Sequence, residues 1–315
     1  MHIVLAQPLA ARYAPQVSAV APGAEVTCLG PDDPVPPSTT VLFADRCPPL
    51  PALEWLQLGS HGYAQAEGVT ALVTNASGVQ DKPIAEWCVL MLLALYRDFP
   101  GMLAAQRSHE WNRSPVFQSE LSGRRVGILG YGNIGREVAR HCSLLGLEIW
   151  VMTRGGVKDR GPRYNAVEPP TPARTFELSE HRDFYTGLDA LIVTTPLTAG
   201  TRRLVDAEAL SLLPRGALLL NPARAGVVDE QALLAALRNG HLGGAALDDH
   251  YRQPMPADDP FWDLPNTIVT AHISGSSGST HYLDRIWDLF LTNLRNFVTG
   301  APMLNVIARS DLRPS

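Results

Sequence analysis

The feature that most constrains the fold is a short apolar run, 126–129, followed at once by the sequence GYGNIG at 130–135. Apolar residues then recur at helical spacing as far as Gly146, and a second apolar run occupies 147–152. This order predicts a βαβ unit with glycines in its first turn. In such a turn the first glycine allows the tight bend, the second admits phosphate close to the backbone, and the third lets the helix pack on the sheet. The sequence therefore predicts a site for the pyrophosphate of a dinucleotide, facing the free N–H groups of the helix.

Length and composition exclude several classes of function. The 315 residues suggest about two domains, and a net charge of -5 without long charged blocks gives no reason to expect a nucleic-acid partner. The 4 cysteines are scattered, which favours reduced thiols in the cytoplasm. The first residues do not resemble a signal peptide, and the apolar helix expected at 84–96 is too short to span a membrane. We expect a cytoplasmic protein that binds a small molecule, and we predict no metal site.

The order of apolar runs predicts two α/β domains. Residues 1–98 contain three short runs separated by proline-rich turns, at 3–6, 41–44 and 55–58. Further along, regular alternation predicts a doubly wound parallel sheet with strands at 126–129, 147–152, 189–195, 217–220, 244–247 and 267–270. The segment 155–187 is only weakly periodic and is expected to be an irregular connection. A helix is expected at 280–298 and should pack back on the first domain.

Reactive residue types follow several of these strands. In an open α/β sheet, ligands bind beyond the carboxyl ends of the strands. Arg224 follows the strand at 217–220, Asp248 follows 244–247, and His272 follows 267–270. A guanidinium can grip a carboxylate with two hydrogen bonds, and an imidazole titrates near neutrality. We therefore expect a cation and a proton donor at one edge of the sheet.

Together with the glycine turn, these residues resemble the D-isomer-specific 2-hydroxyacid dehydrogenase family, which includes glyoxylate/hydroxypyruvate reductases and formate dehydrogenase. The resemblance covers most of the chain, in the segments 59–62, 83–86, 130–135, 195–198, 221–229, 246–248 and 265–275. It implies two Rossmann-like domains: a doubly wound cofactor domain, 99–286, inserted in a smaller flavodoxin-like substrate domain, 1–98 and 287–315. It also implies a homodimer formed through the helical segment around 84–113.

The resemblance further implies the reaction and the residues that carry it. The expected reaction is NAD(P)H-dependent reduction of a small, glyoxylate- or hydroxypyruvate-like 2-oxo acid to the D-2-hydroxy acid, and its reverse. Arg224 would hold the substrate carboxylate, and His272 would give a proton to the carbonyl oxygen. The other substrate-binding residues would be Gly59, Ser60, His61 and Gly62. The cofactor-binding residues would be Gly130, Gly132, Asn133, Ile134, Gly135, Thr153, Arg154, Thr195, Pro196, Ala223 and Asp248.

The chain departs from the family beside the expected catalytic histidine. The family places a glutamate there, five residues beyond the aspartate, whereas this chain has Gln253 at that distance from Asp248. A carboxylate would stabilise the imidazolium, while a neutral amide can orient the ring but adds no charge. We predict Gln253 as the third catalytic residue. Asp249, Asp258 or Asp259 could supply the missing charge instead, but a solvated acidic loop is the favoured interpretation.

Two alternatives follow from these observations. Formate dehydrogenases resemble this chain in having glutamine before proline, and their reaction transfers no proton to a substrate oxygen, so formate oxidation is the first alternative. A dinucleotide-sensing protein similar to the corepressors of this family is the second, because a fold does not dictate function. The presence of Arg224 and His272 argues against the second alternative.

The end of the second strand predicts which cofactor is used. NAD-preferring relatives have an acidic residue there, whereas this chain has Thr153 followed by Arg154, eighteen residues past Gly135. Replacing an acid by a cation beside a 2'-phosphate favours its binding by about 1 to 3 kcal/mol. We therefore predict NADP as the preferred cofactor, with NAD possible.

Overall fold

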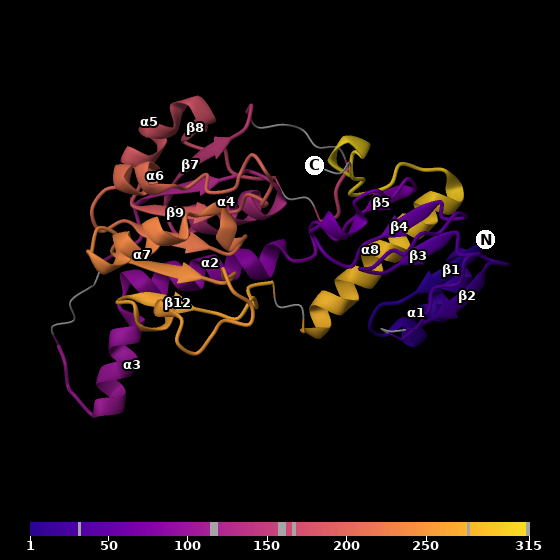
Figure 1. Cartoon of the computed structure of the whole chain (residues 1–315), viewed down its shortest axis with the longest axis horizontal. Helices are drawn as coiled ribbons and strands as arrows, with labels where there is room; N and C mark the ends of the chain where they lie inside the picture. Colours follow the sequence, from indigo (N-terminus) through magenta and orange to yellow (C-terminus); the bar gives the residue numbers. More distant parts are fainter. Residues whose placement is uncertain (31–32, 114–118, 157–161, 166–167, 276–277, 313–315) are drawn as a thin grey trace. The chain divides into compact units, whose positions relative to one another are not determined.

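The computed structural model describes residues 1–30, 33–113, 119–156, 162–165, 168–275 and 278–312. The chain forms two compact units, each built on its own parallel sheet (Figure 1). The first unit contains Met1–Gln80, Asp159–Ala166 and Ser276–Ser315, and the second contains Asp81–Lys158 and Val167–Gly275. The predicted fold class, an α/β protein with two parallel sheets, is confirmed.

The sheet of the first unit has the flavodoxin-like order β2-β1-β3-β4-β5. Its strands are β1 (His2–Leu5), β2 (Glu25–Cys28), β3 (Val41–Phe43), β4 (Trp55–Gln57) and β5 (Leu72–Thr74). Helices α1 (Ala10–Val20) and α8 (Thr280–Thr299) pack on it through an aromatic cluster. Trp287 of α8 stacks on Tyr13 at 4.7 Å between ring centroids, and Phe290 stacks on Phe43 at 4.5 Å. These contacts explain why the C-terminal helix returns to the first unit, as the sequence predicts.

The sheet of the second unit has the order β12-β11-β10-β9-β6-β7-β8. Its strands are β6 (Arg125–Leu129), β7 (Glu148–Thr153), β8 (Arg174–Glu177), β9 (Ala190–Val193), β10 (Leu218–Asn221), β11 (Gly244–Leu247) and β12 (Thr267–Val269). The chain winds outward from β6 in both directions, so the topological switch point lies between β6 and β9. Ligands of doubly wound sheets bind at the carboxyl ends of the strands around this point.

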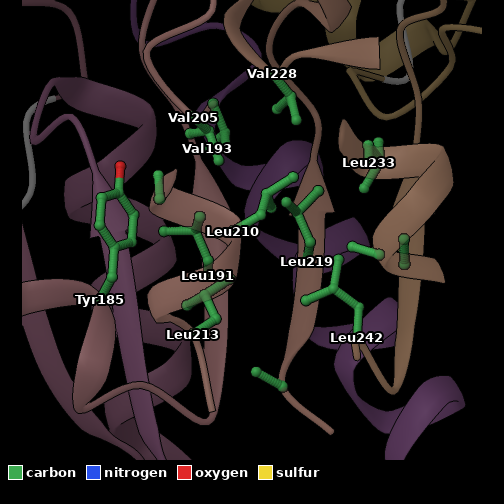
Figure 2. Packing of buried hydrophobic residues seen from close by; sticks show 14 of the residues in the cluster. Tyr185, Leu191, Val193, Val205, Leu210, Leu213, Leu219, Val228, Leu233 and Leu242 are labelled. Atoms are coloured by element: carbon green, nitrogen blue, oxygen red, sulfur yellow. The ribbon is translucent and has the colours of Figure 1, made fainter. Parts of the chain in front are cut away.

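Helices cover both faces of the second sheet. One buried cluster joins it to α2 (Asp81–Tyr96) and α4 (Asn133–Leu144). The other cluster joins it to α5 (His181–Thr186), α6 (Ala207–Leu212) and α7 (Glu230–Arg238). Figure 2 shows this second layer, with Leu191 of β9 and Leu219 of β10 facing Leu210 of α6 and Leu233 of α7. A sheet buried on both faces explains the nearly continuous apolar strands in the sequence.

The structure differs from the prediction in one respect. The segment 155–187 is not irregular throughout, because its described part contains β8, the 3-10 helix Leu178–Glu180 and α5. The compact units divide the chain at 80/81, 158/159, 166/167 and 275/276, whereas the domain boundaries expected from the sequence, 98/99 and 286/287, stay a prediction. The helix α2 belongs to the second unit because its buried side chains, such as Cys88 and Leu92, lie in the cluster with α4.

Among the described residues, no single helix is long and apolar enough to cross a membrane. The pair α2 and α3 (Phe99–Ser108), bent by 61° at the break between them, satisfies length and composition only when taken together. Much of the apolar surface of α2 is buried within the second unit. The remaining short 3-10 helices are Ala64–Ala66, Ala225–Val227, Pro260–Asp263 and Arg309–Leu312.

Candidate active site

The glycine turn lies at the switch point of the second sheet, directly after β6. Gly130 has φ +94°, and a Cβ added there would lie 2.6 Å from Oγ1 of Thr195, so a side chain would be both strained and obstructed. The hydroxyl of Thr194 donates to the carbonyl of Gly130 at 2.7 Å, and the hydroxyl of Thr195 donates to that of Leu129 at 2.8 Å. The end of β9 thus fixes the turn that follows β6.

The helix after this turn begins at Asn133, with Gly132 as its N-cap residue. Gly132 offers no side chain to cap the N–H groups of the first turn. A Cβ on Gly135 would overlap the carbonyl oxygen of Gly130, so the third glycine lets the helix pack directly on the turn. The resulting cradle of backbone N–H groups at a helix N-terminus suits a pyrophosphate.

The end of β7 supplies a further indication of a ligand. Gly130 donates its N–H to Met152 of β7 at 2.9 Å, so Thr153 lies next to the glycine turn. The Thr153 hydroxyl is buried and has no hydrogen-bond partner among the described residues. A buried polar group without a partner is uncommon in folded proteins. The glycine cradle, this hydroxyl and the exposed Arg154 beside it fit a dinucleotide.

The turn after β10 presents Arg224. The buried side chain of Asn221 accepts the N–H of Ala223 at 3.0 Å and donates to the carbonyl of Arg224 at 3.0 Å. The guanidinium of Arg224 is exposed and donates to the carbonyl of Ala223 at 2.7 Å. Asn221 was not among the predicted site residues. Its position at the end of an apolar strand, where a buried amide must be hydrogen-bonded, is the signal that points to it.

The turn after β12 presents His272 and rests on Asp248. The Asp248 carboxylate is fully buried and accepts the N–H groups of Ile273 and Ser274, each at 2.9 Å, and the hydroxyl of Thr270. The N–H of His272 donates to the carbonyl of Asp248 at 2.8 Å. His272 itself has φ 57°, a left-handed conformation that is uncommon for residues other than glycine. The buried carboxylate therefore supports the turn, while a contact between Asp248 and the cofactor stays a prediction.

Asp249 faces the ring of His272. Its Oδ1 lies 3.2 Å from Nδ1 of His272, and its Oδ2 accepts the N–H of Ala225 at 2.7 Å. The side chain of Asp249 is only 11% exposed, against 46% for that of His272. The sequence-based interpretation of this loop as solvated acids is thus wrong for Asp249. It is also wrong for Asp259, which is buried and ion-paired with Arg252 at 2.7 Å.

Gln253 interacts with this carboxylate. Its Nε2 donates to Oδ1 of Asp249 at 2.6 Å, the same oxygen that faces His272. The amide therefore orients Asp249 instead of orienting the histidine ring directly. A catalytic role for Gln253 stays a prediction, now with a different contact from the one expected.

The first unit contains the loop at 59–62, at the carboxyl end of β4. The carbonyl of Gly59 accepts the hydroxyl of Tyr282 at 2.8 Å, and the carbonyl of His61 accepts the side-chain amide of Asn75 at 2.7 Å. The hydroxyl of Ser60 donates to the carbonyl of Gly62 at 3.0 Å. The loop is therefore held through its backbone in a fixed shape.

The doubly wound sheet with a glycine cradle at its switch point defines a dinucleotide-binding α/β protein. Residues 89–274 match the family model described as D-isomer specific 2-hydroxyacid dehydrogenase, NAD binding domain. The chain belongs to this family, which confirms the resemblance inferred from the sequence.

Individual relatives extend the similarity beyond this domain. A glycerate dehydrogenase of Methylorubrum extorquens is 30% identical over 282 residues, covering 84% of this chain and 82% of the relative. A D-3-phosphoglycerate dehydrogenase of Bacillus subtilis is 35% identical over 236 residues, 75% of this chain but only 42% of the relative. The fold is similar to a D-isomer specific 2-hydroxyacid dehydrogenase from Xanthobacter autotrophicus Py2, crystallised with NADPH and MES. That comparison has a TM-score of 0.81 and 27% identity, and covers 99% of each chain.

Proposed function

We propose that this protein reduces a small, glyoxylate- or hydroxypyruvate-like 2-oxo acid to the D-2-hydroxy acid with NADPH, and catalyses the reverse oxidation. One observation carries the proposal. The turns after β10 and β12 both hydrogen-bond to the consecutive aspartates after β11, through Ala225 to Asp249 and through Ile273 to Asp248. This arrangement brings Arg224 and His272 to one edge of the sheet, where the family's reaction needs a cation and a proton donor.

The residues have distinct tasks in the proposed reaction. A bound nicotinamide dinucleotide would supply the hydride. Arg224 would bind the substrate carboxylate through two parallel hydrogen bonds. Gly59, Ser60, His61 and Gly62 are proposed as substrate-binding residues on the family resemblance alone. His272 would donate a proton to the carbonyl oxygen as negative charge develops there. The residues proposed to hold the cofactor are Gly130, Gly132, Asn133, Ile134, Gly135, Thr153, Arg154, Thr195, Pro196, Ala223 and Asp248.

The proposed activity is tested with NADPH and a panel of glyoxylate, hydroxypyruvate, pyruvate and bulkier 2-oxo acids. The oxidative direction is tested with NADP+ and formate. In the parent protein we expect turnover of a small 2-oxo acid. Arg224→Lys should raise KM for that acid by at least about tenfold, because an ammonium cannot form the paired hydrogen bonds of a guanidinium. Tight NADPH binding without any turnover would contradict the proposal and favour the dinucleotide sensor.

Asp249 bears on the formate alternative. That alternative rests on the absence of a carboxylate beside the histidine, because formate oxidation needs no proton on a substrate oxygen. The structure has a carboxylate 3.2 Å from His272. It belongs to Asp249 and not to residue 253. An imidazole paired with a carboxylate suits proton transfer. This contact supports reduction of a 2-oxo acid over oxidation of formate.

The preference for NADP rests on the end of β7. By the family resemblance, Thr153 and the exposed Arg154 correspond to the acid that binds ribose hydroxyls in NAD-preferring relatives. Glu177 pairs with Thr153 in the β7–β8 register, but its side chain accepts a backbone N–H in the capping box with Glu180. The Xanthobacter relative bound to NADPH also supports this choice. Initial rates with NADPH should exceed those with NADH, and equal rates would contradict the preference.

We also propose a homodimer formed through α2 and α3. No residue of α3 is buried, and apolar side chains are exposed along both helices and just beyond them, namely Leu90, Leu93, Phe99, Met102 and Trp111. Leu90 is 55% and Trp111 91% exposed. Large exposed apolar side chains concentrated in one segment are typical of a protein interface. Light scattering should give twice the chain mass, and Leu90→Glu should lower it, whereas Leu144→Glu, at an exposed leucine of α4, should not. A monomer at all concentrations would contradict the proposal.

We propose a cytoplasmic location, because the cysteine thiols are not joined in disulfides. Cys28, Cys47, Cys88 and Cys142 are all free in the structure. Free thiols persist in reducing compartments.

A further inference from the structure

We propose that Asp249 is the carboxylate that lies beside His272 and orients its ring, in place of the family's glutamate at the position of Gln253. This inference rests on the proposed function. It assigns Asp249 as a positioning residue, since it acts through His272 and not on the substrate.

The Asp249 carboxylate is fixed at three points. Oδ1 lies 3.2 Å from Nδ1 of His272 and accepts a hydrogen bond of 2.6 Å from Nε2 of Gln253. Oδ2 accepts a hydrogen bond of 2.7 Å from the backbone N–H of Ala225. A mostly buried carboxylate with fixed hydrogen bonds interacts with an imidazolium more strongly than a solvated one. When Nδ1–H is donated to Asp249, Nε2 is the ring nitrogen that remains for the substrate oxygen.

The other charged groups nearby have different partners. The Asp248 carboxylate is occupied by the N–H groups of Ile273 and Ser274. The Arg224 guanidinium donates to the carbonyl of Ala223, and Nε2 of His250 lies 2.7 Å from the carbonyl of Thr270. Among the described charged groups, Asp249 is therefore the one that contacts the His272 ring.

The identity of residue 253 follows from this arrangement. A glutamate at 253 would bring a second carboxylate to the oxygen that Gln253 now contacts at 2.6 Å. Two carboxylates held within hydrogen-bond distance of each other cannot both stay ionised. An amide instead donates a hydrogen bond to Asp249. One negative charge thus remains beside the histidine, moved four positions earlier in the sequence.

The proton balance of the reduction is simple. The carbonyl carbon gains the hydride as the C–O π bond breaks, and the oxygen takes the proton from Nε2 of His272. The imidazolium becomes neutral and regains its proton from solvent. Asp249 takes no part in the proton transfer itself and acts by holding the ring through Nδ1.

The first test is Asp249→Asn, with Asp258→Asn as the matched control, because Asp258 is an exposed acid of the same loop. We expect Asp249→Asn to lower kcat/KM for the 2-oxo acid about 10- to 100-fold. The alkaline limit of reduction should move to lower pH, since a protonated ring would lose its counter-charge. Binding of NADPH should not change. Asp258→Asn should leave all three quantities as in the parent.

The second test moves the charge back to the family's position. Asp249→Asn combined with Gln253→Glu should recover most of the rate and of the alkaline limit, which a merely structural defect would not do. Nitrogen NMR of His272 supplies a readout independent of activity. The parent should carry its neutral-state proton on Nδ1, and Asp249→Asn should weaken that preference.

The outcomes separate the two proposals. If the parent reduces a 2-oxo acid and His272→Asn abolishes turnover, but Asp249→Asn leaves the pH profile and tautomer unchanged, the role of Asp249 is refuted while the function stands. If the parent reduces no 2-oxo acid although the NMR preference depends on Asp249, the function is refuted and the pairing stands. A double variant without recovery would also overturn the inference.

Discussion

The carboxylate of Asp248 lies beneath the turn of His272 and accepts the N–H of Ser274 at 2.9 Å, while its backbone carbonyl accepts the N–H of His272 at 2.8 Å. The two residues are therefore linked through both side chain and backbone. Because His272 has φ 57°, its turn needs support from its surroundings. A buried carboxylate with only acceptor oxygens matches a turn that presents several donors.

We predict that Asp248→Asn destabilises the protein and loosens the turn that holds His272 in position. An amide has one acceptor oxygen, and its NH₂ group would face an N–H donor. Leaving buried donors unsatisfied should cost about 1 to 3 kcal/mol of the free energy of unfolding, measured in urea. The turnover number should fall as well. Asp258→Asn serves as the exposed control, and an unfolding curve equal to that of the parent would disprove the supporting role.

The second prediction concerns the glycine cradle. A methyl group at residue 135 would collide with the carbonyl of Gly130, so Gly135→Ala should push α4 away from the turn. We expect Kd for NADPH, measured by fluorescence titration, to rise at least about tenfold. Gly200→Ala is the control, because a Cβ at Gly200 would meet no atom within 4 Å. Unchanged affinity in Gly135→Ala would place the dinucleotide elsewhere.

The third prediction concerns the choice of cofactor. Arg154→Asp replaces a cation next to the Thr153 hydroxyl with the acid that NAD-preferring relatives use. The ratio of kcat/KM with NADPH to that with NADH should fall about 10- to 100-fold. Arg174→Asp, at the opposite end of β8 in the register, is the control for a change of surface charge. A ratio that moves equally in both variants would exclude a local contact.

The strands of the second sheet and the terminal helix were predictable, because burial sets their pattern: both faces of the strands are covered, and one side of α8 packs on the first unit. The expected strand at 244–247 coincides with β11, and the expected helix at 280–298 is α8 within one residue. Other elements leave a weak pattern. In β8 only Phe176 is buried, and the edge strand β2 has no buried residue, so neither shows an alternation that a sequence can reveal.

The sequence draws attention to residues that come after strands: Asp248 directly follows β11, and Arg224 lies three residues past the end of β10. Their roles in a site stay predictions. The contact between Asp249 and His272 could not be predicted from the sequence, because the two residues follow different strands, β11 and β12, and meet only in the folded chain. Charge and spacing alone do not distinguish Asp249 from Asp258, which is exposed. Only the fold shows which acid turns inward.

Away from the site, the buried carboxylate of Glu137 in α4 forms an ion pair with the partly exposed Arg140. Its carboxylate accepts two hydrogen bonds from Arg140, at 2.6 and 3.1 Å, and lies 3.5 Å from Nδ1 of His141. Burial alone would raise the pKa of Glu137. The hydrogen bonds and charge of Arg140, with the charges of His141 and Lys82, outweigh it and lower the pKa below the ordinary value.

The fourth prediction follows from the sign of this shift. A carboxyl group whose pKa is lower in the folded state stabilises the protein above its unfolded pKa, and this contribution disappears as pH falls through the folded pKa. Glu137→Gln should therefore cost about 1 to 3 kcal/mol of the free energy of unfolding at pH 7, because the charge-assisted hydrogen bonds are lost. The difference from the parent should shrink when the urea unfolding is repeated at pH 4. Glu67→Gln, at an exposed glutamate, should show little change at either pH. A difference that is the same at both pH values would mean that Glu137 stabilises the helix by packing and not by its charge.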